Sequence, residues 1–136
     1  MAMEQLQVLG AKIAGFPGYG DEDARRRSDE LVRSYLGEAL SGLQARLQPL
    51  DEAIERRLDD LIVRSAFANQ AAYEAFEERA RERPQFDAIA AADARVVEAA
   101  DAAAAVGTAG AAEYLDRVTQ ALDARDAAME GGVSCT

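Results

Sequence analysis

The stretch that decides the fold is Asp21–Leu47, DEDARRRSDELVRSYLGEALSGLQARL. Its apolar and small residues recur at intervals of one, three and four positions: Ala24, Ser28, Leu31, Val32, Tyr35, Leu36, Ala39, Leu40, Leu43 and Leu47. This spacing predicts one continuous stripe on an α-helix, because residues three and four positions apart share a helix face. Asp21 is suited to cap the helix at its N-terminus. We therefore expect the other helices to pack against this one.

Four further helices are indicated by apolar periodicity, with proline and glycine marking their ends. They are expected at Glu4–Ala14, Leu50–Arg83, Pro84–Val106 and Ala111–Met129. The short link at Gln48–Pro49 allows a hairpin or a kinked rod, and the hairpin is favoured because it buries both apolar stripes. The sequence thus predicts an all-α, antiparallel helical bundle of four main helices plus a short N-terminal helix.

The length and composition bound this bundle. The 136 residues favour one domain, expected over residues 1–130, with residues 131–136 as a flexible C-terminal tail. Hydrophobic residues make up 49% of the chain, but many are alanine, and aromatic residues account for only 6%. A thin core with closely approaching helices follows from that composition.

The charge balance bears on partners. The formal net charge is −10, from 25 acidic and 15 basic residues, which argues against nucleic acid and anionic membranes as partners. The excess of acid either keeps the protein soluble or meets a basic partner. No apolar run reaches the length of a membrane span or a signal peptide, so a cytoplasmic location is expected. The single cysteine, Cys135, allows no internal disulfide.

Catalytic and metal chemistry find little support in the residues. Histidine is absent, which removes the most frequent general base and metal ligand. Asp51, Glu55 and Asp59 fall at four-residue spacing, but that pattern is typical of an exposed helix face. The arginine triplet Arg25–Arg27 favours ion pairs along its own helix over an anion site. We expect no enzymatic role, no cofactor and no metal.

The turn Gly15–Gly20 joins the first two helices. Pro17 and Gly18 suit the central positions of a type II turn, where glycine supplies a positive φ. The turn could form a binding loop, or its aromatic residues Phe16 and Tyr19 could close the end of the bundle. The second interpretation is favoured.

Polar residues within apolar stripes indicate a possible pocket. Asp93 lies in the stripe of the helix Pro84–Val106, so its carboxyl group must be paired, hydrogen-bonded or at an edge. Asn69 lies in the stripe of the preceding helix, where it either bends the helix or satisfies a polar group across the bundle. Together with Tyr35 they form the tentative polar lining of an interior site for a small molecule or a cation.

Three aromatic residues indicate an interaction surface. In a continuous helix Leu50–Arg83, Phe67 and Phe76 lie about 180° apart with Tyr73 between them, so a single packing layer leaves one side uncovered. A second subunit is the expected cover, and a symmetric dimer is the commonest arrangement. The favoured function is therefore a non-enzymatic interaction protein or accessory subunit that self-associates. A ligand-binding bundle and an acidic protein with a basic partner are the alternatives.

Overall fold

The structure is a computed structural model that describes residues 2–131, and within that range it contains helices and no strand. The all-α fold class predicted from the sequence is confirmed. The helices are α1 (Ala2–Lys12), α2 (Glu22–Arg46), α3 (Glu52–Ala66), α4 (Gln70–Glu82), α5 (Asp87–Ala102) and α6 (Ala111–Glu130), with the short 3-10 turns η1 (Ala103–Ala105) and η2 (Thr108–Gly110).

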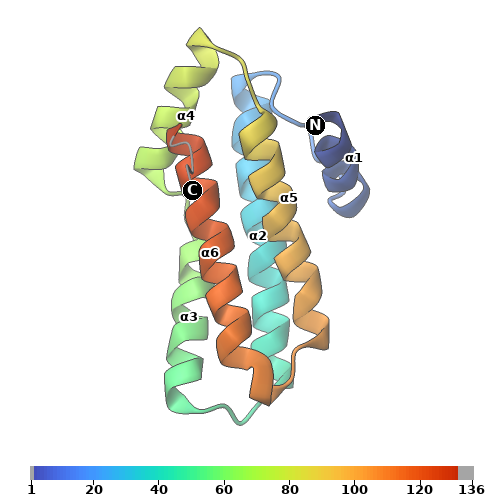
Figure 1. The fold of residues 1–136 in the computed structure, drawn as a ribbon, viewed down its shortest axis with the longest axis vertical. Helices are drawn as coiled ribbons and strands as arrows, with labels where there is room; N and C mark the ends of the chain where they lie inside the picture. The colour runs from blue at the N-terminus through green and yellow to red at the C-terminus, as the bar shows by residue number, and fades with distance from the viewer. Residues whose placement is uncertain (1, 132–136) are drawn as a thin grey trace.

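The long helices α2, α3, α5 and α6 lie side by side, with α4 above α3 and α1 against α5 (Figure 1). Figure 1 shows α2 and α5 descending while α3 and α6 ascend, so the partners within the hairpins α2–α3 and α5–α6 run in opposite directions. The hairpin at Gln48–Pro49 is thereby confirmed. Helices α2 and α5 also contact each other, and these two run in the same direction.

Helix α2 has the buried face that its apolar spacing predicts. Ser28, Val32, Leu36, Leu40 and Leu43 are buried, and Leu40 is 0% exposed. The carboxylate of Asp21 accepts a hydrogen bond from the backbone N–H of Ala24 at 2.8 Å, as expected of an N-cap residue. Helix α2 packs against α3 and α5, whereas α1 packs on α5 and α4 packs on α6, so the expectation that the other helices all pack against α2 is met only in part.

The prediction of one helix over Leu50–Arg83 is wrong. The chain leaves the helix at Phe67, whose backbone is extended with φ −127° and ψ 142°. Asn69 then starts α4, because its side-chain oxygen accepts a hydrogen bond from the N–H of Ala72 at 3.2 Å. Asparagine is among the best N-cap residues, and here this local bond competes successfully with continuation of the helix.

The other helices begin and end within a few residues of the bounds predicted from the sequence. Helix α1 starts and ends two residues before the expected Glu4–Ala14, and α5 begins three residues after Pro84, at Asp87. Helix α6 reaches Glu130, and Gly131 ends it in the left-handed conformation with φ 77°. Gly131 is therefore a helix cap rather than part of a tail. Residues 132–136, including Cys135, lie outside the described residues.

The turn Gly15–Gly20 closes the upper end of the bundle, as favoured from the sequence. Gly18 has φ 82°, which suits the third position of a type II turn. Tyr19 is 5% exposed, and its ring centroid lies 5.8 Å from that of Phe16 and 5.8 Å from that of Phe86. The side chains of this turn are thus part of the core.

The buried apolar residues form two clusters. The larger one fills the middle and lower bundle with residues of α1, α2, α3, α5 and α6. The smaller one surrounds Tyr19 and Phe76 at the upper end. On α5, Asp93 lies between Ile89 of the small cluster and Val96 of the large one, so a polar layer separates the two.

No helix in the described part of the chain combines the length and the apolar character of a membrane span.

Leu40→Ala tests the burial of the apolar face of α2. Since Leu40 is fully buried, the substitution is expected to lower the free energy of unfolding by about 2–5 kcal/mol in urea denaturation. Met3→Ala is the control, because Met3 is 73% exposed and its truncation should change the value by less than about 0.5 kcal/mol. Equal effects of the two substitutions would contradict the burial of this face of α2.

Candidate functional site

The three residues of the predicted pocket are not brought together, since each has partners of its own. The hydroxyl of Tyr35 donates a hydrogen bond to Asp101 at 2.5 Å, at the end of α5. The amide of Asn69 donates to Asp126 on α6 at 3.0 Å, besides capping α4. Asp93 is completely buried in a separate network. The structure therefore gives no interior pocket made by these three side chains.

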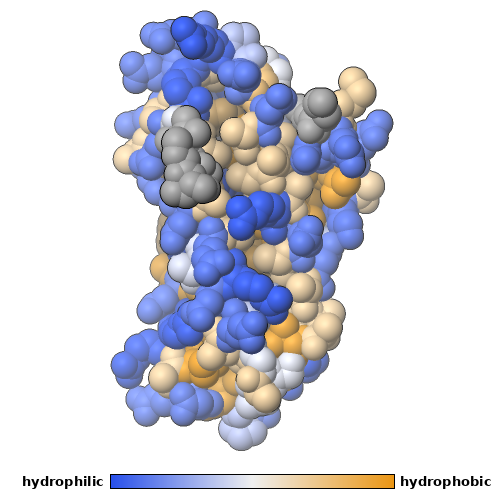
Figure 2. All heavy atoms as spheres, viewed as in Figure 1, coloured by the Kyte–Doolittle hydropathy of each residue, from blue (hydrophilic) through white to orange (hydrophobic). Residues whose placement is uncertain are grey.

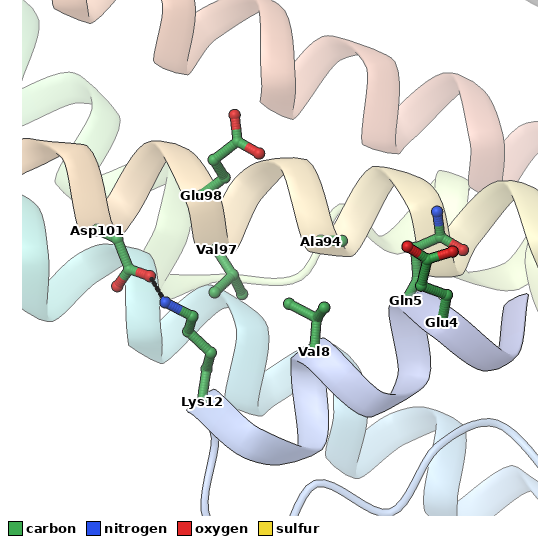
Figure 3. Close-up of a pocket in the computed structure, with 8 residues that line it drawn as sticks. All are labelled: Glu4, Gln5, Val8, Lys12, Ala94, Val97, Glu98 and Asp101. Carbon is green, nitrogen blue, oxygen red and sulfur yellow. Dashed lines mark hydrogen bonds and ion pairs between the residues drawn. The ribbon is translucent and has the colours of Figure 1, made fainter. Parts of the chain in front are cut away.

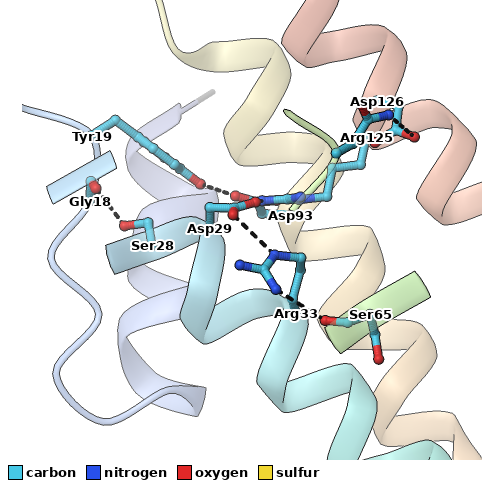
Figure 4. Close-up of polar contacts among 10 residues, drawn as sticks. Gly18, Tyr19, Ser28, Asp29, Arg33, Ser65, Asp93, Arg125 and Asp126 are labelled. Atoms are coloured by element: carbon cyan, nitrogen blue, oxygen red, sulfur yellow. Dashed lines mark hydrogen bonds and ion pairs between the residues drawn. The ribbon is translucent and has the colours of Figure 1, made fainter. Parts of the chain in front are cut away.

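Asp93 belongs to a layer of buried charges that crosses α2, α5 and α6 (Figure 4). Arg125 of α6 donates to Asp93 through Nε and to Asp29 of α2 through Nη2 at 2.8 Å. The hydroxyl of Tyr19 donates to the other oxygen of Asp93 at 2.6 Å, and Arg33 donates to Asp29 at 3.0 Å. Of the three states expected for the Asp93 carboxylate (paired, hydrogen-bonded or at an edge), the structure shows the first two together.

Burial and charge shift the pKa values in this layer in different directions. Burial raises the pKa of the Asp93 carboxyl group, and the charge of Arg125 and the hydrogen bond from Tyr19 oppose that shift. Burial also raises the pKa of the Tyr19 hydroxyl, and the negative charge of Asp93 raises it further. For Arg125 burial lowers the pKa, but the two carboxylates outweigh burial and raise it overall. The arginine stays charged and the tyrosine remains a donor at neutral pH.

A second buried ion pair links α2 to α4. Arg25 donates to both carboxylate oxygens of Glu77, at 2.7 and 2.9 Å, and to the backbone carbonyl of Tyr19 at 3.1 Å. The hydrogen bond to Glu77 raises the pKa of Arg25. The bidentate geometry makes this one of the stronger pairs in the chain. Of the arginine triplet, Arg26 and Arg27 pair along their own helix as expected, but Arg25 points inward.

A sequence signal for these charges existed. On α2, Arg25 and Asp29 continue the three- and four-residue spacing of Val32, Leu36 and Leu40, so they lie on the buried face. On α6, Arg125 lies in the same spacing, between Leu122 and Met129. The spacing predicts which helix face each charged residue lies on, but it does not predict which residue of another helix is its partner.

The buried layer is suited to holding helices together, and its geometry offers no open reaction centre. Asp93 is 0% exposed and Arg125 is 4% exposed, so a substrate has no access to the carboxylate. Among residues 2–131 there is no grouping of three or more carboxylate or thiol side chains close enough to hold a metal ion.

A groove of about 410 Å³ lies between α1 and α5 (Figure 3). Val8, Ala94 and Val97 form its apolar floor, and Lys12 closes one end through an ion pair with Asp101 at 2.6 Å. Glu98 lines the groove but points away from α1 in Figure 3. Glu4 and Gln5 line the opposite end, so the polar groups of the groove lie at the two ends of its apolar floor.

The corner between α3 and α4 is the most exposed apolar site in the described residues outside the N-terminal helix. Phe67 is 71% exposed and Val63, one turn earlier, is 59% exposed. Both side chains line a hollow of about 310 Å³, together with Ala68 and Leu122. Large apolar side chains grouped in this way are a frequent mark of a protein interface.

The tentative interface residues are divided by the helix break. Tyr73 and Phe76 are 8% and 3% exposed and lie in the smaller core cluster, so their side chains face the chain's own interior. The geometric argument that set Phe67 and Phe76 on opposite faces of one helix fails, because they belong to different segments. Phe67 alone of the three remains available to a partner.

Comparison of the chain with protein-family models, with curated proteins and with solved structures found no match.

Arg125→Met tests the buried layer. The substitution leaves Asp29 and Asp93 buried without their shared cation, so the free energy of unfolding should fall by about 3–5 kcal/mol in urea denaturation. Arg57→Met is the matched control, because its pair with Asp116 is exposed and is worth at most about 1 kcal/mol. A loss no larger than that of the control would mean that the layer does not stabilise the fold.

The raised pKa values of the tyrosine hydroxyls predict that the fold loses stability at alkaline pH. All four have a raised pKa, mainly through burial for Tyr19, Tyr73 and Tyr114 and mainly through the hydrogen bond to Asp101 for Tyr35. Tyr35 and Tyr114 rise from 10.0 to about 12. Since the unfolded chain releases these protons first, the free energy of unfolding should fall as the pH rises from 10.0 to about 12.

Urea denaturation across this pH window measures whether the free energy of unfolding falls, and phenolate absorbance reports the ionisation of the tyrosines. Tyr35→Phe removes one titrating group and should make the decline shallower. A free energy of unfolding that stays level or increases with pH would contradict the raised values.

Proposed function

We propose that the protein is a non-enzymatic interaction protein that self-associates through the corner between α3 and α4. The observation that carries this proposal is the exposed pair Val63 and Phe67 beside the hollow lined by Leu122. An isolated exposed leucine or valine is common on protein surfaces. Phe67, in contrast, is 71% exposed and lies beside a hollow whose lining combines apolar side chains with Arg33, Arg64, Asn69, Arg125 and Asp126.

The corner is held rigidly by polar contacts, which suits a binding surface. Arg64 donates to Asp123 at 2.9 Å and to Asp126 at 3.0 Å, so the end of α3 is tied to α6. Arg33 donates to the carbonyl of Ser65 at 3.2 Å, close to the point where the helix ends. A surface that is ordered before binding loses less conformational entropy when a partner covers it.

Two copies related by a two-fold axis would present the same corner to each other. In such a dimer the ring of Phe67 of each subunit would enter the hollow that Val63 and Leu122 line on the other subunit. The arrangement uses one surface of the chain and closes on itself, so it produces a dimer rather than a filament.

The two alternatives remain hypotheses with less support. An interior ligand site loses its proposed lining, because Tyr35, Asn69 and Asp93 have separate partners. The net charge of −10 is compatible with a basic partner, although several carboxylates are already engaged in ion pairs within the chain. A rise in melting temperature with small cations or with a basic peptide would favour one of them.

Phe67→Glu tests self-association. The wild type is expected to sediment as a dimer at micromolar concentration, and Phe67→Glu as a monomer with unchanged helical circular dichroism. The charge would have to be buried in the dimer, whereas in the monomer it lies in water.

Val8→Glu is the matched control, since Val8 is a 42% exposed apolar residue on α1, and this variant should remain a dimer. A monomeric wild type at high concentration would end the proposal. Dimers that persist in Phe67→Glu would move the interface away from this corner.

A further inference from the structure

A groove runs along the contact between α5 and α6. Two hollows, of about 460 and 260 Å³, follow one another along it and share Arg95 as a lining residue. On α5 the lining positions recur every three or four residues from Ala88 to Ala102, and on α6 from Tyr114 to Ala128. The groove is therefore continuous over most of both helices, and on α5 the distance along the helix axis from Ala88 to Ala102 is about 21 Å.

Alanine forms most of the floor of this groove, including six alanines in the larger hollow. Figure 2 shows the side on which α5 and α6 lie in front, where pale orange surface extends over both helices and is interrupted by blue. Because alanine side chains are short, the backbone of a partner helix can approach closely while its longer apolar side chains fill the hollows.

The charged residues that line the groove are mainly basic, Arg79, Arg95 and Arg117 against Glu98, in contrast to the acidic chain as a whole. Arg95 and Arg117 are exposed, and neither forms an ion pair with a carboxylate of residues 2–131. Most of the other basic residues do form such pairs or, like Arg79, bind carbonyl groups at a helix end. Glu98 is the carboxylate among the lining residues of the smaller hollow.

We propose that the α5–α6 groove binds an acidic amphipathic helix of a partner protein. Leucine-like side chains of that helix would occupy the two hollows, and its carboxylates would face Arg95 and Arg117. With a net charge of −10 the chain repels an acidic partner at most of its surface. Arg95 and Arg117, the second of which lies over the ring of Tyr114, give the groove a local positive charge that attracts such a helix.

This surface is separate from the corner at Phe67, and the proposal goes beyond self-association. None of the residues that line the two hollows lines the hollow at the corner. Phe67→Glu should therefore leave binding at the groove unchanged, and the failure of one proposal would not decide the other.

The test uses the full chain and a synthetic helical peptide of about four turns, which matches the length of the groove. The peptide carries leucine along one face and glutamate on the other, and a fluorescent label reports binding by anisotropy. A second peptide has lysine at every glutamate position. The glutamate peptide is expected to bind and the lysine peptide is not, because only the first complements the two arginines.

Charge reversal locates the site. The double variant Arg95→Glu/Arg117→Glu is expected to weaken binding of the glutamate peptide by about tenfold or more, since two attractive contacts become repulsive. Arg26→Glu/Arg56→Glu changes the net charge equally at exposed positions of α2 and α3 that line neither hollow, and should weaken binding by less than about threefold. Circular dichroism of both variants verifies that they are folded.

Three results would overturn the proposal. The first is absence of binding of the glutamate peptide to the wild type. The second is an equal loss of affinity in the two double variants, which would show a general charge effect. The third is equally tight binding of a single-stranded oligonucleotide, which would mean that the arginines attract any polyanion rather than a helix.

Discussion

The ion pairs of Arg125 with Asp29 and Asp93 are the contacts on which the arrangement of the bundle depends. They join α2, α5 and α6 at one level, between the two apolar clusters. If one of these helices slipped by a turn, a buried charge would lose its partner, and that costs several kcal/mol. Apolar contacts among alanines specify the register of helices much less strictly, because many positions are alike. Tyr19 extends the same layer to the turn after α1 through its bond to Asp93.

Arginine side chains also provide contacts between helices that a thicker apolar core would otherwise provide. Arg33, Arg46 and Arg79 each donate to backbone carbonyl groups near the C-terminal end of another helix or of a 3-10 turn. Carbonyls in a last turn have no N–H four residues ahead within the helix, although those of Ala103 and Ala128 also accept a bond from Val106 and Gly131. A cation there also meets the negative end of the helix dipole. A chain with few aromatic residues thereby fixes its helix ends through long side chains that cross between helices.

The same features explain which surfaces are open to partners. The break at Phe67 and the cap at Asn69 turn α4 inward over α6, so that Phe76 is buried while Phe67 stays outside. The alanine composition of α5 and α6 leaves hollows along their contact, where longer side chains would have filled the space. One surface is thus apolar and prominent, whereas the other is concave and edged by arginine.

The sequence by itself determined the all-α class, the long helix α2 with its buried stripe, and the closure of the bundle by Phe16 and Tyr19. These follow from periodicity and turn chemistry, which act between residues close in the chain. It also required a partner for Asp93, but it did not name Arg125, which is 32 residues away. Only the tertiary structure decided that pairing, the break at Phe67 and the separation of Tyr35 from Asn69, because each depends on which helices meet. Local preference sets where a helix can form, and packing between distant segments decides where it ends and what its polar side chains contact.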